Sequence, residues 1–173
     1  MTNFKGVDVL LDAASMYENA DTLTLISGDG ELRENLEEQA QRLNLKNVKF
    51  LGNQPQTVLK DIYNIADVSC VPSRREPFGL VAAEAMACGT PVIATNEGGL
   101  PDFINKKVGI LVPVDDSEKL ALAVKQVISG EKVFDREEIA KEAMDKHSVD
   151  KKVDEFKERY KVAIKNIERD FER

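Results

Sequence analysis

The amino-acid sequence predicts an α/β fold, with a Rossmann-like parallel sheet and helices on both of its faces. Amphipathic helical patterns alternate with short apolar runs along most of the chain, which is typical of a parallel sheet covered by helices. Glycine-containing turns separate several of these segments, as at Gly28-Asp29-Gly30 and Gly98-Gly99. The length of 173 residues suits one domain with its own hydrophobic core. We therefore expect a single domain over residues 1–173.

Each expected element follows from the spacing of its apolar residues. Helices are predicted over Val7–Ala14, Leu32–Leu43, Thr57–Ile65, Leu80–Ala87 and Leu120–Ile128. Strands are predicted over Thr22–Ser27, Val48–Gly52, Val68–Val71, Val92–Thr95 and Gly109–Val112. One more short helix is expected directly after Gly98-Gly99.

The end of the chain, residues 148–173, is expected to form a long charged helix. Its apolar side chains alternate spacings of four and three, at Val149, Val153, Phe156, Tyr160, Ala163 and Ile167. Two interpretations of this stripe remain open. Either the helix packs on its own domain, or its far end, near Ile167 and Phe171, docks on another domain or chain.

The charge and the apolar content of the chain exclude several classes of partner. A net charge of −7 argues against a general nucleic-acid or anionic-membrane surface. No run approaches the roughly 18 apolar residues that a membrane-spanning helix needs. Met1 is followed by polar Thr2-Asn3, so we expect no signal peptide and a cytoplasmic location.

The residues that most often build metal sites and nucleophilic triads are scarce. Cys70 and Cys88 lie in apolar stretches without a CxxC pattern, and we expect them to be small core residues. The one histidine, His147, is expected at the start of the C-terminal helix, in a surface or capping role. The sequence therefore predicts neither a histidine-based metal site nor a Ser-His-Asp triad.

Four loops follow predicted strands and are expected to meet on one side of the sheet. They are Gly28–Gly30, Gly52–Gln54, Pro72–Gly79 and Asn96–Leu100. Ligands of parallel α/β sheets bind outside the carboxyl ends of the strands, where such loops converge. This side of the sheet is therefore the expected site.

The most informative motif runs from Glu76 to Glu84 and reads Glu-Pro-Phe-Gly-Leu-Val-Ala-Ala-Glu. Two carboxylates bracket the turn Pro77–Gly79 and the first residues of a helix. The turn offers unpaired backbone N–H groups and the positive end of a helix dipole, which favour phosphate. Carboxylates accept strong hydrogen bonds from sugar hydroxyls. The motif therefore indicates a nucleotide-sugar site.

The stretch Val71–Asp102 resembles the retaining glycosyltransferases of the GT-B fold, in the large group 1 (family 4-type) class. The match continues through Gly109–Pro113, and Gly28–Gly30 and Val48–Gly52 fit upstream. The resemblance implies that this chain is the C-terminal, donor-binding half of such an enzyme. The whole enzyme would transfer a sugar from a nucleoside diphosphate sugar to a hydroxyl acceptor with retention of anomeric configuration.

The resemblance also implies roles for three charged residues. Glu76 would be the catalytic carboxylate that holds donor-sugar hydroxyls, Glu84 would hold the ribose hydroxyls, and Lys5 would meet the diphosphate. Each has a structural alternative. Glu76 could only complement the helix dipole, Glu84 could be a solvated helix residue, and Lys5 could be an exposed side chain.

The same resemblance places the donor on backbone groups. Its sugar and diphosphate would lie against Pro77, Phe78, Gly79 and Leu80. The nucleobase edge would be read by the loop of Gly52, Asn53 and Gln54. Phe78 could equally be a core residue.

Arg74 and Arg75, just before Glu76, could add positive potential to the site or could be solvated. No metal and no cofactor are expected, because fixed dipoles and Lys5 can stabilise the leaving diphosphate.

The chain departs from the family pattern at its N-terminus. The N-terminal acceptor-binding domain has no counterpart here, and the strand with a Gly-Arg pair that should precede Lys5 has no room. We expect a disturbed sheet edge and an isolated domain that is inactive alone.

The sequence leaves three other functions to compare. The first is a nucleotide-sugar-binding regulatory module without catalysis, and the second is a sugar epimerase. The third, a dinucleotide enzyme, is disfavoured because Arg33 stands where the third glycine of a G-x-G-x-x-G fingerprint would be.

Overall fold

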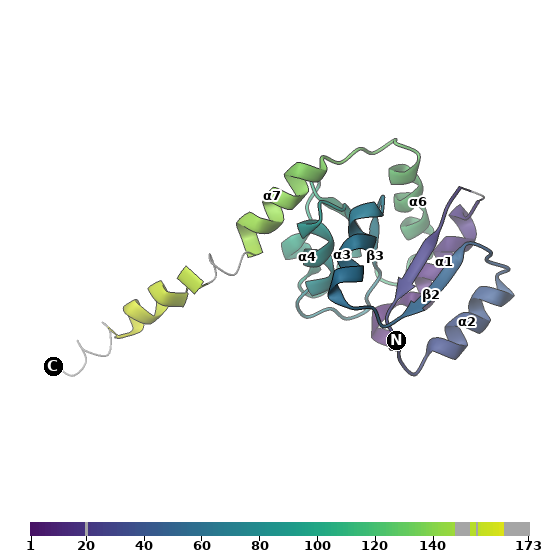
Figure 1. Ribbon diagram of the computed structural model, residues 1–173, viewed down its shortest axis with the longest axis horizontal. Helices are drawn as coiled ribbons and strands as arrows, with labels where there is room; N and C mark the ends of the chain where they lie inside the picture. Colours follow the sequence, from purple (N-terminus) through teal and green to yellow (C-terminus); the bar gives the residue numbers. More distant parts are fainter. Residues whose placement is uncertain (20, 148–152, 155, 165–173) are drawn as a thin grey trace.

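The computed structural model describes residues 1–19, 21–147, 153–154 and 156–164 (Figure 1). Its strands are β1 Thr24–Ser27, β2 Val48–Gly52, β3 Ser69–Val71, β4 Val92–Thr95 and β5 Gly109–Val112. A 3-10 turn, η1 Asn3–Lys5, comes first. The helices are α1 Val7–Tyr17, α2 Arg33–Arg42, α3 Gln56–Ile65, α4 Leu80–Ala87, α5 Leu100–Phe103, α6 Ser117–Ile128 and α7 Arg136–His147.

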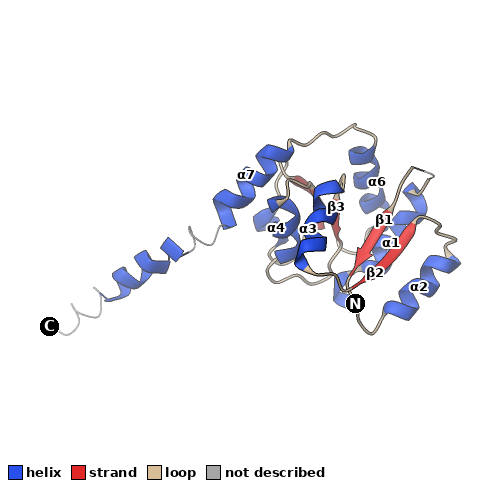
Figure 2. Ribbon diagram, in the orientation of Figure 1, coloured by secondary structure: helices blue, strands red, loops and turns tan. Residues whose placement is uncertain are grey.

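The strands are parallel and flanked by helices, so the α/β class is confirmed (Figure 2). They are divided, however, between two sheets, β1-β2 and β3-β4-β5, where the sequence suggested one. Within the described residues no strand pairs with both β1 and β3. The segment before α1, where the family's first strand was expected to be missing, forms η1 and not a strand. Residues 3–5 therefore supply no strand to either sheet.

Strand β4 is the centre of the larger sheet, and its side chains show how the helices cover both faces. All four of its residues are buried. Ile93 belongs to a core cluster that includes α1 and α6, whereas Val92 and Ala94 belong to a second cluster that includes α4 and α7. Successive residues of a strand point to opposite faces, so the two clusters cover the two faces of this sheet.

The first six residues connect the two sheets at the carboxyl ends of their strands. The carbonyl of Met1 accepts the N–H of Leu32, which follows β1, at 3.3 Å. The carbonyl of Phe4 accepts the N–H of Arg74, which follows β3, at 2.8 Å. Gly6 lies so close to β3 that a Cβ there would be 1.9 Å from the Pro72 carbonyl oxygen. The segment that carries Lys5 is therefore held against the end of β3.

Helix α7 was not predicted, and its position corrects the role expected for His147. This histidine is the last residue of α7 and not the first residue of a later helix. Ile139 and Ala143 are buried against α4. These two residues form an apolar stripe that is too short to stand out in a charged segment. The Arg136 guanidinium donates to the carbonyls of Ala66 and Asn64 at 2.9 Å, and so caps the end of α3.

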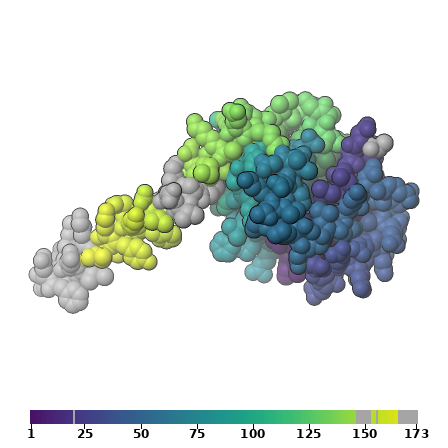
Figure 3. Space-filling view, in the orientation of Figure 1, coloured from purple at the N-terminus to yellow at the C-terminus, as the bar shows by residue number. Residues whose placement is uncertain are grey.

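The C-terminal helix is described in part. Residues 156–164 are helical, while 148–152, 155 and 165–173, with Val149, Ile167 and Phe171, lie outside the described residues. Phe156 and Tyr160 are 57% and 69% exposed, and in Figure 3 the yellow helix projects away from the rounded body. The interpretation in which this helix packs on its own domain therefore fails for residues 156–164. Among the described residues, no helix combines the length and the apolar content that crossing a membrane requires.

Candidate functional site

The four loops predicted to converge do so in pairs. The N–H of Gly28 donates to the carbonyl of Gly52 at 2.7 Å, and that of Gly99 donates to the carbonyl of Glu76 at 2.9 Å. The second contact depends on glycine, because a Cβ on Gly98 would lie 2.1 Å from the Glu76 carbonyl oxygen. Residues 1–6 join the two pairs of loops, as described above. The loops therefore lie together at the carboxyl ends of the strands.

Glu76 is the buried charge of this region, with only 6% of its surface exposed. Its Oε2 accepts hydrogen bonds from the Lys5 ammonium at 2.8 Å and from the Ser73 hydroxyl at 3.4 Å. Its Oε1 accepts the N–H of Gly79 at 3.2 Å. Both carboxylate oxygens thus have partners, as a buried ionised group requires.

The pKa of Glu76 reflects this environment. Desolvation pushes the pKa upward, but the hydrogen bonds from Lys5 and from the Gly79 N–H outweigh it, so the pKa lies below its usual value. Glu76 is therefore an anion at neutral pH and complements the N-terminus of α4. The helix-dipole role is present in the structure, and sugar binding by Glu76 stays a prediction.

Lys5 is half-exposed, with 48% of its side chain accessible, and its ammonium is held by Glu76. It is thus an oriented cation and not an unattached side chain. The remainder of its surface faces solvent, so an anionic ligand can approach the same ammonium. The structure brings these two predicted site residues together across 71 positions of sequence.

The start of α4 presents apolar side chains outward. Phe78 and Leu80 are 71% and 66% exposed, and Pro77 is also exposed. The alternative in which Phe78 is a core residue is therefore wrong. Gly79 adopts φ +66° as the residue before the helix, a conformation that favours glycine. Its N–H is already bonded to Glu76, so a phosphate would have to compete with that carboxylate for this donor.

Glu84 lies one turn into α4 and is half-buried. Its Oε1 accepts the Gln56 side-chain amide at 3.4 Å, and its Oε2 accepts the Tyr63 hydroxyl at 3.5 Å. Both partners come from α3. Desolvation, followed by the charge of Glu84, raises the pKa of Tyr63 to about 12. Glu84 is thus not a fully solvated helix residue, although both of its hydrogen bonds are long.

Gln56 and Tyr63 were missed by the sequence interpretation. The available signal was their position on the helix that follows the loop Gly52–Gln54. In that loop Gly52 is buried and Asn53 is exposed. The Gln54 amide donates to the Leu51 carbonyl at 2.6 Å, so this side chain shapes the loop.

The two arginines before Glu76 differ in burial and in ion pairing. Arg74 is mostly buried and forms ion pairs with Asp8 and Asp115, both at 2.6 Å, whereas Arg75 is exposed. The positive charge of Arg74 is therefore neutralised within the protein. Arg75 alone of the two presents an exposed side chain beside the site.

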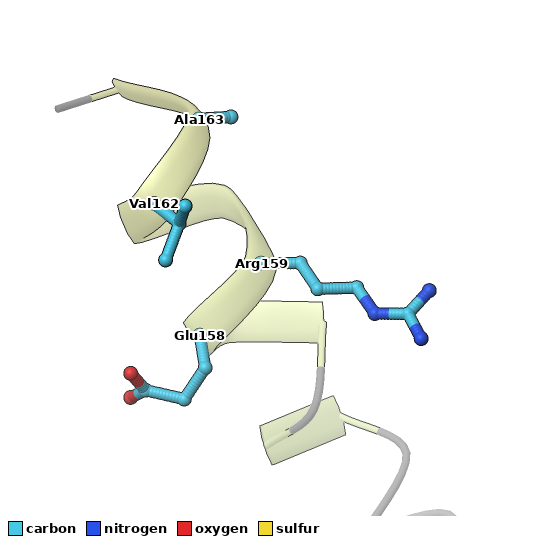
Figure 4. Close-up of a pocket in the computed structure, with 4 residues that line it drawn as sticks. All are labelled: Glu158, Arg159, Val162 and Ala163. Carbon is cyan, nitrogen blue, oxygen red and sulfur yellow. The ribbon is translucent and has the colours of Figure 1, made fainter. Parts of the chain in front are cut away.

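Other chemical groups give no competing site within the described residues. Burial raises the pKa of the Cys70 thiol to about 12, which disfavours the reactive thiolate. No group of three or more His, Cys, Asp or Glu side chains in the described ranges is arranged to hold a metal ion. The shallow depression in Figure 4, lined by Glu158, Arg159, Val162 and Ala163, belongs to one exposed helical segment and contains no predicted site residue.

Comparisons with known proteins agree with this architecture. Residues 1–146 match the family model described as glycosyl transferases group 1. An uncharacterised glycosyltransferase of Methanocaldococcus jannaschii is 35% identical over 174 residues, which cover 98% of this chain and 45% of that protein. The D-inositol 3-phosphate glycosyltransferase of Saccharomonospora viridis is 46% identical over 136 residues, covering 71% of this chain and 32% of the relative.

Solved structures give the same result. Sucrose-phosphate synthase from Thermosynechococcus elongatus superposes with a TM-score of 0.84 at 30% identity, covering 95% of this chain and 44% of that one. HepE from Anabaena, in complex with UDP and glucose, superposes with a TM-score of 0.84 at 26% identity, covering 94% and 46%. The chain therefore spans less than half the length of these relatives.

Proposed function

The chain belongs to the glycosyl transferases of group 1, and from that premise we propose that it is the donor-binding domain of a retaining, family 4-type glycosyltransferase. The whole enzyme would move a sugar from a nucleoside diphosphate sugar to a hydroxyl acceptor. The observation that carries this proposal is the pairing of Lys5 with buried Glu76 at the N-terminus of α4, at 2.8 Å. That helix also carries Glu84.

Lys5 and the N-terminus of α4 supply the positive charge for a diphosphate. The ammonium of Lys5 and the helix dipole favour the negative charge that develops on a departing nucleoside diphosphate. Both are fixed before the ligand arrives, so little reorganisation is needed. Under this proposal the chemistry does not depend on a divalent metal.

The two carboxylates divide the sugar groups of the donor between them. Glu76 would accept donor-sugar hydroxyls while it holds the Lys5 ammonium toward the diphosphate. Glu84 would accept two charge-assisted hydrogen bonds from the ribose diol, with Gln56 and Tyr63 beside it. The loop Gly52–Gln54 would face the nucleobase.

The relatives support this proposal in two ways. The complex of HepE with UDP and glucose shows that one structural neighbour binds a nucleoside diphosphate and a sugar. The relatives are also more than twice as long as the matched region, so we place the acceptor site in the remaining part of such an enzyme. The isolated chain would then bind the donor but turn it over little, because water exclusion and the acceptor site are incomplete.

A thermal-shift panel tests the proposal. The melting temperature is measured with uridine, guanosine and adenosine diphosphates and with their sugar conjugates. One diphosphate should raise it, because ligands that bind only the folded state stabilise that state. The Glu84→Ala variant should lose most of this shift. The matched control is Glu38→Ala, which removes an exposed glutamate from α2.

The outcomes of the panel test the donor-binding proposal and the ribose role of Glu84 separately. No shift with any of the three diphosphates would overturn the proposal, and an unchanged shift in Glu84→Ala would overturn the ribose role. A regulatory module would bind the same ligands. Adding the N-terminal half of a full-length relative separates the two cases, because sugar transfer in that mixture requires a catalytic domain.

A further inference from the structure

The side chain of Arg74 connects three segments of the chain around the Lys5–Glu76 pair. We propose that Arg74 is a positioning residue, which holds the Lys5 ammonium opposite Glu76 in the geometry that receives a diphosphate. This inference rests on the proposed function. It assigns no contact between Arg74 and the ligand.

The hydrogen bonds of Arg74 use all three guanidinium nitrogens. Nη1 and Nη2 donate to the two carboxylate oxygens of Asp8, at 2.8 and 2.6 Å. Nη1 also donates to the carbonyl and the side-chain oxygen of Asn3, both at 2.9 Å. Nε donates to Asp115 at 2.6 Å. Asp115 lies in the loop between β5 and α6, so Arg74 ties η1, α1 and that loop to the end of β3.

These bonds surround Lys5. Two of the partners, Asn3 and Asp8, lie on either side of Lys5 in the sequence. The N–H of Arg74 donates to the carbonyl of Phe4, the residue next to Lys5, at 2.8 Å. Glu76 is two residues beyond Arg74. Both ends of the Lys5–Glu76 pair are therefore anchored at Arg74.

The charge balance supports a positioning role. Two carboxylates, Asp8 and Asp115, neutralise the single charge of Arg74. The hydrogen bond from Arg74 also lowers the pKa of Asp8, so this pair stays ionised at neutral pH. A guanidinium paired with two carboxylates offers little net attraction to a ligand anion. The effect of Arg74 on an anion therefore acts through Lys5.

The geometry of the bonds requires arginine. The paired bonds to Asp8 are of the bidentate type that a planar guanidinium makes and an ammonium does not. An Arg74→Lys variant keeps the charge but loses the fork. It should leave Lys5 less well placed while the long-range potential of the site is unchanged.

The experiment measures the affinity gained from the second phosphate. Dissociation constants are determined by calorimetry for the nucleoside diphosphate that gives the largest thermal shift and for its monophosphate. The gain is the dissociation constant of the monophosphate divided by that of the diphosphate. In Arg74→Lys this ratio should fall by roughly tenfold, the scale of one misplaced charge-assisted contact. The monophosphate affinity should change by less than about twofold.

A matched control separates positioning from a general loss of stability. Arg136 also ties different segments together, with hydrogen bonds to carbonyls at the end of α3. Arg136→Lys should lower the melting temperature without changing the monophosphate-to-diphosphate ratio of dissociation constants. Asp115→Asn, which weakens one exposed bond of Arg74, provides a milder variant and should lower the ratio by about twofold to threefold.

A double-mutant cycle provides the decisive readout. In a Lys5→Met background, Arg74→Lys should change the ratio no further, because Lys5 is the group through which Arg74 acts. Independent, multiplicative effects of the two substitutions would overturn the inference, as would an unchanged ratio in Arg74→Lys. A wild-type chain that binds no diphosphate would instead overturn the proposed function itself, so the two failures are distinguishable.

Discussion

Glu76 and Glu84 lie at the two ends of the same motif, yet the protein holds them differently. Glu76 is 6% exposed and has a 2.8 Å bond to Lys5 and a backbone N–H donor. Glu84 is half-buried, and its two partners from α3 are 3.4 and 3.5 Å away. No described contact joins the two carboxylates. One acid is thus part of the folded framework, while the other is loosely held.

Under the proposed function, the difference lets one motif serve both stability and binding. A buried carboxylate that pairs with Lys5 and accepts the Gly79 N–H is kept ionised and in place by the fold itself. A half-buried carboxylate with long hydrogen bonds can exchange its partners for ligand hydroxyls at little cost. Substitutions at the two positions should therefore separate the two contributions.

The largest expected effect is on stability. Glu76→Ala leaves the buried N–H of Gly79 without its acceptor and removes a negative charge from the N-terminus of α4, which should lower the free energy of unfolding by about 2 kcal/mol. The ion pair with half-exposed Lys5 adds little to this loss of stability. Glu84→Ala should lower the same free energy by less than about 0.5 kcal/mol. Urea denaturation followed by circular dichroism measures both.

Equal losses of stability in Glu76→Ala and Glu84→Ala would remove the contrast. Glu76→Gln serves as the conservative control, because an amide oxygen can still accept the Gly79 N–H. It should recover roughly half of the lost stability.

A second effect, on acid stability, follows from the lowered pKa of Glu76. A carboxyl group with a lower pKa in the folded state stabilises the protein above its unfolded pKa, and this stability is lost as pH falls through the folded pKa. Lys5→Met removes the hydrogen bond that does most to lower the pKa. The Glu76 pKa should rise, and acid unfolding should begin at higher pH.

Carbon-13 NMR of the Glu76 carboxyl group gives this pKa directly. Lys107→Met is the matched control, since it removes an exposed ion pair with Glu138, away from the site. A Glu76 pKa that is unchanged in Lys5→Met would show that the backbone donors alone hold the carboxylate.

Several elements of the fold could be predicted from the local sequence alone. The helix Leu80–Ala87 and the strands Val92–Thr95 and Gly109–Val112 have the bounds that were predicted, because short apolar runs between turn residues determine them locally. The family resemblance assigned Lys5 and Glu76 to the same donor site. Their mutual hydrogen bond required the structure.

The missed features depend on contacts between distant segments. The hydrogen bonds of Arg74 reach residues 41 to 71 positions away, and such pairs leave no periodic pattern. The division of the strands into two sheets depends on whether a strand pairs between β1 and β3, which the local sequence of either strand does not encode. Helix α7 packs through only a few apolar residues, so its stripe was too weak to identify.

The smallest expected effect concerns Tyr63, which hydrogen-bonds Glu84 at 3.5 Å. At neutral pH, Tyr63→Phe should lower the free energy of unfolding by less than about 0.5 kcal/mol, because a bond at this length contributes little.

At alkaline pH the effect of Tyr63→Phe on the free energy of unfolding reverses its sign. Burial raises the Tyr63 pKa from 10.0 to about 12, so its contribution is complete below pH 10 and is lost as pH rises through the folded value. Tyr63→Phe should therefore lose stability less steeply than wild type over this interval. Urea denaturation at several pH values measures the slope, and a slope equal to that of wild type would mean that Glu84 and the α3–α4 contact leave this hydroxyl as solvated as in the unfolded chain.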